Sequence, residues 1–215
     1  MRISILCSDP RHPVFPHLKE WADSHKAAHA VELVHETGRL SGGDMLFLVS
    51  CSELVDRGTR GKFRYSLVIH ASDLPVGRGW SPHIWQVLEG KRRITVTLLE
   101  AGDQIDAGPI WAQEAFELEG HELADEINSK LFAVELSLMD FAVSNAGSVA
   151  PQAQNPSSAT YYRKRTPEDS RLDPESTLAA QFDLLRVADP VRYPAFFEHR
   201  GHRYIVRIEK QRTPK

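Results

Sequence analysis

Two polar side chains of this sequence follow apolar, strand-like runs and could act together as an acid–base pair. His70 ends the run at residues 66–69, and Asp106 lies 36 residues further on, in the loop after the run at 95–99. Open α/β sheets assemble small-molecule sites at the carboxyl ends of their strands. If the two strands are neighbours, the carboxylate can orient the imidazole for proton transfer. A hydrogen-bonded structural histidine is the alternative interpretation of His70.

The elements around this pair predict an α/β fold with a Rossmann-like, mostly parallel twisted sheet and helices on both faces. Short apolar runs typical of buried strands alternate with helical patterns. Strands are expected at residues 3–7, 30–34, 45–49, 66–69 and 95–99, with an outer strand at 110–118. Apolar residues spaced three and four apart predict helices that include residues 18–25, 84–88 and 121–144.

A change in composition divides the chain into a larger unit, residues 1–149, and a small C-terminal α+β unit, residues 150–215. Residues 150–158 are rich in Pro, Gln, Asn and Ser, which is typical of a linker or surface loop. Beyond them the pattern predicts a helix starting at Ser176, with Leu178, Phe182 and Leu185 facing inward. A hairpin of residues 195–198 and 204–208 is expected to turn at Gly201.

The composition indicates a globular, cytoplasmic protein without nucleic-acid or membrane partners. The chain has 215 residues, a net charge of −3 and 26% charged residues, so no global field attracts polyanions. No apolar run approaches the ~20 residues of a membrane helix. Cys7 and Cys51 lack a spacing that indicates a disulfide. No metal site is predicted, because His25 and His29 lack an evident third ligand.

Several motifs in register resemble those of the folate-dependent formyltransferases, which include methionyl-tRNA formyltransferase and glycinamide ribonucleotide transformylase. They are a strand ending in His70, Ser-x-Leu-Pro at 72–75, Arg78-Gly79, Pro82, the run 90–97 and Asp-x-Gly-x-Ile at 106–110. The resemblance covers roughly residues 45–171. Within the family, residues 70–85 look most like the sugar N-formyltransferases of pseudaminic-acid-type pathways. They also look like formylation domains fused to some nonribosomal peptide synthetases.

This resemblance implies transfer of a formyl group from 10-formyltetrahydrofolate to the primary amine of a nucleotide-activated amino sugar, without a metal or a covalent intermediate. His70, held by Asp106, would stabilise the developing oxyanion and carry the proton. Folate-binding positions are expected at Ser50, Cys51, Ser52, Leu54, Ala101, Gly102, Asp103 and Ile105. Acceptor-binding positions are expected at Arg78, Gly79, Trp80, His83, Arg163, Lys164 and Arg165.

One position departs from the family pattern, which usually has Asn two residues before the catalytic His. This chain has Val68 there, and loss of such an oxyanion donor can cost on the order of 3 kcal/mol. Either His70 acts alone, or another group fills in, or the site is inactive. The candidates for filling in are Ser50, Cys51, Ser52 and His83.

Three functions therefore stay open at this point. The first is formylation of an amino sugar, and the second is formylation of an aminoacyl group on tRNA or on a carrier protein. The third is a non-catalytic protein that binds folate or a nucleotide sugar. The helix at 121–144 and the hairpin could form a homodimer surface or pack within the chain.

Overall fold

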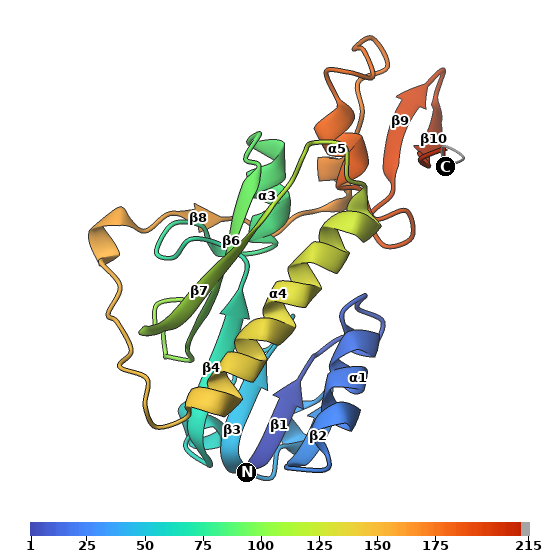
Figure 1. The fold of residues 1–215 in the computed structure, drawn as a ribbon. Coiled ribbons are helices and arrows are strands. Elements are labelled where there is room, and N and C mark those ends of the chain that lie inside the picture. The colour runs from blue at the N-terminus through green and yellow to red at the C-terminus, as the bar shows by residue number, and fades with distance from the viewer. Residues whose placement is uncertain (212–215) are drawn as a thin grey trace.

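A six-stranded sheet in the order β2-β1-β3-β4-β6-β7 forms the centre of the computed structural model, which describes residues 1–211 (Figure 1). β1, β2, β3 and β4 are parallel, while β6 runs antiparallel to β4 and β7 antiparallel to β6. The predicted mostly parallel α/β sheet is confirmed. The strands are β1 (Arg2–Leu6), β2 (Ala30–Val34), β3 (Gly43–Leu48), β4 (Phe63–His70), β6 (Arg93–Glu100) and β7 (Ile110–Glu117).

The two long helices, α1 (Phe15–His25) and α4 (Ala124–Asn145), cover the main apolar core of the sheet. Each buries one stripe of apolar residues, as their spacing predicts: Leu18 and Trp21 in α1, Ile127, Leu131 and Leu138 in α4. A second apolar cluster lies under the segments 35–42 and 50–61, which hold only η1 (Thr37–Arg39) and the short α2 (Arg57–Arg60). α3 (Pro82–Leu88) follows the loop after β4.

Residues 150–162 return to the sheet side of the chain through a pair of very short strands and an isolated bridge. β5 (Arg78–Gly79) pairs in parallel with β8 (Tyr161–Tyr162), and Gln152 forms an isolated bridge with Ile110. The remaining elements are η2 (Pro156–Ser158), η3 (Pro167–Ser170), α5 (Phe182–Arg186), β9 (Ala195–His199) and β10 (His202–Val206). Figure 1 shows α5 and the β9–β10 hairpin beyond the carboxyl ends of the parallel strands. The predicted hairpin is confirmed.

The helix predicted to start at Ser176 is wrong in its extent, because only Phe182–Arg186 is helical. Residues before it form turns, and Leu178 is 71% exposed instead of facing inward. The Gln181 side chain accepts a hydrogen bond from Asp173 N and donates one to Asp173 O. These side-chain bonds hold the backbone in turns and compete with helix formation.

No helix within residues 1–211 is long and apolar enough to cross a membrane.

Candidate active site

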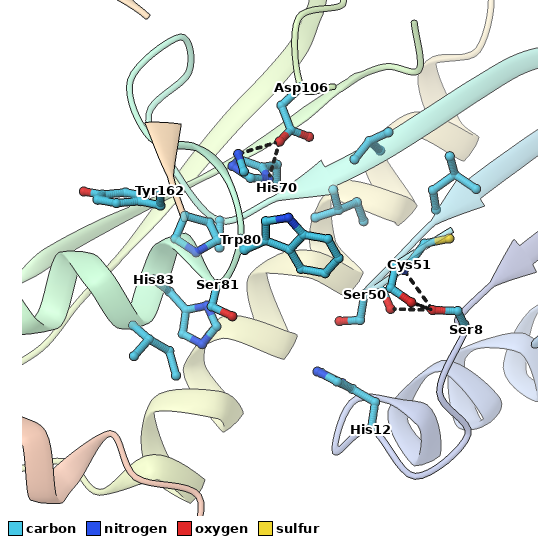
Figure 2. Close-up of a pocket in the computed structure, with 18 of the residues that line it drawn as sticks. Ser8, His12, Ser50, Cys51, His70, Trp80, Ser81, His83, Asp106 and Tyr162 are labelled. Carbon is cyan, nitrogen blue, oxygen red and sulfur yellow. Dashed lines mark hydrogen bonds and ion pairs between the residues drawn. The ribbon is translucent and has the colours of Figure 1, made fainter. Parts of the chain in front are cut away.

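His70, the last residue of the central strand β4, faces Asp106 at the carboxyl end of that strand (Figure 2). Its side chain is 7% exposed, and Nδ1 lies 3.5 Å from Oδ2 of Asp106, whose side chain is 8% exposed. Nε2 lies 2.8 Å from the carbonyl oxygen of Gly77. Because a carbonyl only accepts, Nε2 carries a proton, and Nδ1 is the ring nitrogen left to face the carboxylate. The structure thus brings the two predicted catalytic residues together.

The route by which Asp106 reaches His70 differs from the one expected. β4 and β6 are neighbours, but they are antiparallel, so that Thr97 lies opposite His70 and Glu100 opposite Leu67. The carboxyl end of β6 therefore points away from His70. Asp106 returns to it through the loop 101–109, with φ at 54°, and Gly79 N donates to its Oδ2 at 2.9 Å.

The Asp106 loop is held from outside by Gln154, a residue of the segment predicted to be a linker. Gln154 Nε2 donates to the carbonyl oxygens of Asp106, at 2.9 Å, and Gly108, at 2.8 Å. Its Oε1 accepts from Arg78 at 2.6 Å. The C-terminal segment thus positions the Asp106 carboxylate. The sequence does not predict this contact, because a single Gln in a polar stretch carries no pattern that indicates a partner.

A cavity of about 730 Å³ opens beside the pair. It lies at the carboxyl ends of β3 and β4 and reaches both faces of the sheet. This volume is in the range of small-molecule sites. One part, the β6-loop lobe, is lined by Leu48, Cys51, Val68 and Ala101, which pack in the second apolar cluster, and by Ile105. The other part, the α4 lobe, is lined by Leu131 and Phe132 of the main core and by His12, His83 and Glu135. His70 and Asp106 also line this cavity. They lie at the carboxyl end of β4, between the β6-loop lobe on one face of the sheet and the α4 lobe on the other.

Most of the predicted binding residues line this cavity. They are Ser50, Cys51, Ser52, Leu54, Ala101, Gly102, Ile105, Gly79, Trp80, His83, Lys164 and Arg165. Figure 2 shows the Trp80 indole between His70 and the Ser50–Cys51 segment. Lys164 Nζ lies 4.7 Å from the centre of the Trp80 ring, so this cation and this aromatic ring form one element of the wall.

Three predicted binding residues do not line the cavity, because each has partners within the chain. Arg78 is 4% exposed and donates to Gln154 and Tyr161. Arg163 pairs with Asp169 and lies over the Trp85 ring. Asp103 pairs with Arg60 and is 74% exposed at its side chain. The structure thus shows these three side chains in contact with other parts of the chain, and their predicted ligand contacts stay predictions.

Glu135 is a buried acidic residue of the cavity that sequence reasoning missed. It is 5% exposed, and its Oε2 has no hydrogen-bond partner within the described part of the chain. Burial raises the pKa of this carboxyl to about 8. The available signal was a charged residue one turn after Leu131 in the apolar stripe of α4, where core residues are expected.

Two histidines of the α4 lobe are held in the neutral form. Burial, with the charge of Arg192 as a smaller cause, lowers the pKa of His12 to about 4. Burial also lowers the pKa of His83 to about 4, with the charge of Arg165 as a smaller cause. Within residues 1–211, no cluster of three His, Cys, Asp or Glu side chains is arranged to hold a metal ion.

Glu135 makes stability depend on pH. Its pKa is raised in the folded protein, so between about pH 4.5 and pH 8 the folded state holds a proton that the unfolded state has lost, and stability falls as pH rises. Glu135→Gln removes this penalty, so its stability advantage over the parent chain should grow across that window, by up to about 5 kcal/mol. Urea unfolding at pH 5 and pH 8 measures it. Asp125→Asn, at an exposed carboxylate of the same helix, should give no such trend; a pH-independent difference for Glu135→Gln would contradict the prediction.

With the geometry of the site in place, the similarity to known proteins identifies the family. Residues 7–143 match the family described as formyl transferase. The match covers more than half of the chain, which therefore belongs to the formyl transferase family. The resemblance to the folate-dependent formyltransferases is thereby confirmed.

Curated relatives share this family but are longer. Methionyl-tRNA formyltransferase of Anaeromyxobacter dehalogenans is 30% identical over 155 residues, which are 71% of this chain and 46% of the relative. The protein of the same name from Streptococcus gordonii is 26% identical over 151 residues, 69% of this chain and 49% of the relative. The chain thus spans about half the length of the curated relatives it matches.

Solved structures share the fold over the full chain. A methionyl-tRNA formyltransferase from Clostridium thermocellum has a TM-score of 0.83 at 20% identity, covering 100% of this chain and 95% of its own. HypX from Aquifex aeolicus in complex with tetrahydrofolic acid has a TM-score of 0.76 at 21% identity, and the match covers 97% of this chain and 37% of HypX. A sugar N-formyltransferase from Shewanella sp. FDAARGOS_354 has a TM-score of 0.75 at 12% identity, and the match covers 100% of this chain and 99% of that structure's chain. At these identities the similarity establishes the fold.

Proposed function

We propose that this protein transfers a formyl group from 10-formyltetrahydrofolate to the primary amine of a nucleotide-linked amino sugar. The observation that carries the proposal is the buried His70–Asp106 pair, 3.5 Å apart, in the wall of a ligand-sized cavity. Membership of the formyl transferase family supports the reaction class. HypX, part of whose chain shares this fold, is in complex with tetrahydrofolic acid, which supports the donor.

The β6-loop lobe fits a flat heterocycle that has hydrogen-bonding edges. Its walls are apolar at Leu48 and Val68, and Ile105 at the rim is 59% exposed. No hydrogen bond within residues 1–211 engages the backbone N–H or C=O group of Gly102, which lines the cavity. These free groups can pair with the donors and acceptors of a pterin ring, as expected for a polar edge in an apolar slot. Ala101, Gly102 and Ile105, with Leu48 and Val68, would therefore hold the folate.

The protein's own groups are arranged for proton transfer. 10-Formyltetrahydrofolate supplies an electrophilic formyl carbon that a neutral amine can attack. With a proton on each ring nitrogen, His70, fixed through Nε2 by Gly77 O, can donate from Nδ1 to the oxygen on which negative charge develops as the amine nitrogen bonds to the formyl carbon. Asp106, fixed by Gly79 N, can accept the proton that the amine nitrogen loses. The Nδ1 proton then passes to the folate nitrogen as its bond to the formyl carbon breaks and the C=O bond re-forms, and Asp106 returns its proton to Nδ1, so charge and protons balance.

An amino sugar is the acceptor that we favour over an aminoacyl group. The chain has a net charge of −3, which gives no attraction to tRNA. Lys164 and Arg165 line the cavity, and Arg165 Nε is buried without a partner within the described residues. Two cations at one rim suit a diphosphate. The aminoacyl alternative rests on the curated methionyl-tRNA formyltransferases, and the assay below includes it.

The test is turnover of purified protein with 10-formyltetrahydrofolate and a panel of amines, followed by release of tetrahydrofolate. The panel contains UDP- and dTDP-linked 4-amino-4,6-dideoxyhexoses, methionine amide and methionyl-tRNA. Turnover with a sugar nucleotide is expected. Turnover with methionyl-tRNA alone would replace the sugar by the aminoacyl acceptor, and no turnover with any amine while folate still binds would refute formyl transfer.

Val68→Asn is expected to raise kcat. Residues 68 and 70 of β4 point to the same side of the strand, and both line the cavity. An amide there adds a donor beside His70; since removing one oxyanion donor costs about 10²–10³ in kcat, a gain of about tenfold is expected from a transplanted one. Steady-state kinetics against the parent and against Val68→Thr, which keeps the branched shape, measures it. An unchanged kcat would mean that another group already supplies the donor.

A further inference from the structure

The turn of residues 77–79 holds both members of the His70–Asp106 pair through its backbone. The carbonyl oxygen of Gly77 lies 2.8 Å from Nε2 of His70. Gly79 N donates to Oδ2 of Asp106 at 2.9 Å. Both glycines have positive φ, 79° and 98°, and glycine itself imposes little on the backbone. The geometry of the turn therefore depends on the neighbours that hold it.

The neighbour that holds this turn is β8, and Thr160, just before β8, makes two of the contacts. Gly77 N donates to Oγ1 of Thr160 at 2.8 Å, and Arg78 N donates to its carbonyl oxygen at 2.9 Å. Trp80 N donates to the carbonyl oxygen of Tyr162 at 3.1 Å. Figure 1 shows β8 beside the loop that follows β4. Of these three bonds, only the one to Oγ1 uses a side chain, so only this bond can be removed by substitution.

Thr160 holds Gly77 on both sides. One bond fixes the N–H of Gly77, and the other fixes the N–H of the peptide group whose carbonyl oxygen faces His70. Because that peptide group is planar and trans, fixing its N–H also fixes the direction of its C=O. Gly77 is buried, so water has little access to replace a lost partner. Thr160 is exposed and does not line the cavity, so any effect on the reaction passes through Gly77.

We propose that Thr160 is a positioning residue of formyl transfer, which acts through Gly77 on the imidazole of His70. The inference rests on the proposed function and adds to it a residue outside the family match at 7–143. The bond between Nε2 and Gly77 O fixes the rotation of the ring, so that Nδ1 faces Asp106. Loss of the Oγ1 acceptor frees the backbone at Gly77 to turn. A displaced ring then donates less well to the developing oxyanion.

Thr160→Val keeps the branched shape and removes the hydroxyl, so it tests the bond to Gly77 N directly. With the preferred sugar nucleotide of the panel, kcat should fall about tenfold, since small misplacements of a catalytic group are costly. The KM values for 10-formyltetrahydrofolate and for the acceptor should stay within about twofold, because Thr160 lies outside the cavity wall. Thr160→Ser, which restores the hydroxyl, should return kcat to within about twofold of the parent value.

The matched control is Thr177→Val. Thr177 is also exposed, and its Oγ1 also accepts from a backbone N–H, that of Ala180 at 3.2 Å. Neither residue lines the cavity. Thr177→Val should therefore leave kcat unchanged. Thermal unfolding checks that each variant is folded.

A double mutant adds a readout that a merely structural role would not give. If Thr160 acts through His70, adding Thr160→Val to His70→Ala should cause no further loss of kcat, because the imidazole is already absent. Single-turnover assays measure these slow variants. A loss by the same factor in both backgrounds, or a folded Thr160→Val with the parent kcat, would overturn the inference and leave formyl transfer standing. Silence of the parent chain with every amine would refute the proposed function itself, and the inference with it.

Discussion

Replacing His70 with alanine is expected to lower kcat for formyl transfer by at least about 10³-fold. The imidazole is the group that can both donate to the developing oxyanion and carry the proton, and each of these contributions is worth roughly 10²–10⁴. A factor of 10³ corresponds to about 4 kcal/mol of transition-state stabilisation. The KM for the folate should change little, because the walls of the β6-loop lobe come from other residues. Steady-state kinetics with the sugar nucleotide gives both constants.

The control for this variant is His199→Ala, at an exposed histidine at the end of β9 that does not line the cavity. His199→Ala should leave kcat unchanged. His70 is buried, so folding of His70→Ala is checked by circular dichroism and by folate binding. A folded His70→Ala variant that binds folate and keeps more than a tenth of the parent kcat would place the proton-transfer role elsewhere.

Much of the framework of this site could be predicted from sequence, because it depends on local patterns. Apolar runs located the strands within a few residues, and the i, i+3, i+4 spacing located α4. The motif around His70 predicted the family that residues 7–143 confirm. These signals are strong because each is set by burial of neighbouring residues along one element.

The direction of β6 and the partners of the arginines could not be predicted in the same way. An apolar run such as residues 95–99 is compatible with a parallel or an antiparallel neighbour, so the loop route of Asp106 could not be predicted. Arg78 finds Gln154 across 76 positions of sequence. An arginine beside a motif looks the same in sequence whether it binds a ligand or holds a loop. Only tertiary contacts separate these two functions.

The lack of tertiary information also explains why the sequence did not predict that Glu135 lines the cavity. In sequence it is one charged residue in a long amphipathic helix, where most charges face solvent. Its importance comes from three-dimensional facts: a cavity beside it, and no partner for Oε2 within the described residues. Burial of an unpaired carboxyl costs stability, so Glu135→Leu should be at least as stable as the parent.

Gly108→Ala is expected to damage both the fold and the site through the Asp106 loop. A Cβ at position 108 would overlap the carbonyl oxygen of Glu100, which is backbone and cannot rotate away. The loop 101–109 must then move, and with it Asp106, two residues earlier, and the carbonyl of Gly108 that Gln154 holds. Overpacking of this kind costs roughly 1–3 kcal/mol or more. Urea denaturation should show this loss, and kcat should fall at least about 10²-fold, because the carboxylate no longer faces Nδ1 of His70.

The matched control is Gly38→Ala, since a Cβ there meets no atom within 4 Å. It separates the general entropic effect of Gly→Ala substitution, which is slightly stabilising where the backbone allows it, from the clash at position 108. Gly108→Ala should also lower folding stability more than Asp106→Asn does. The asparagine keeps the acceptor for Gly79 N and leaves the loop in place. If Gly108→Ala keeps both the stability and the kcat of Gly38→Ala, the loop tolerates displacement, and the fixed geometry of Asp106 is not what catalysis requires.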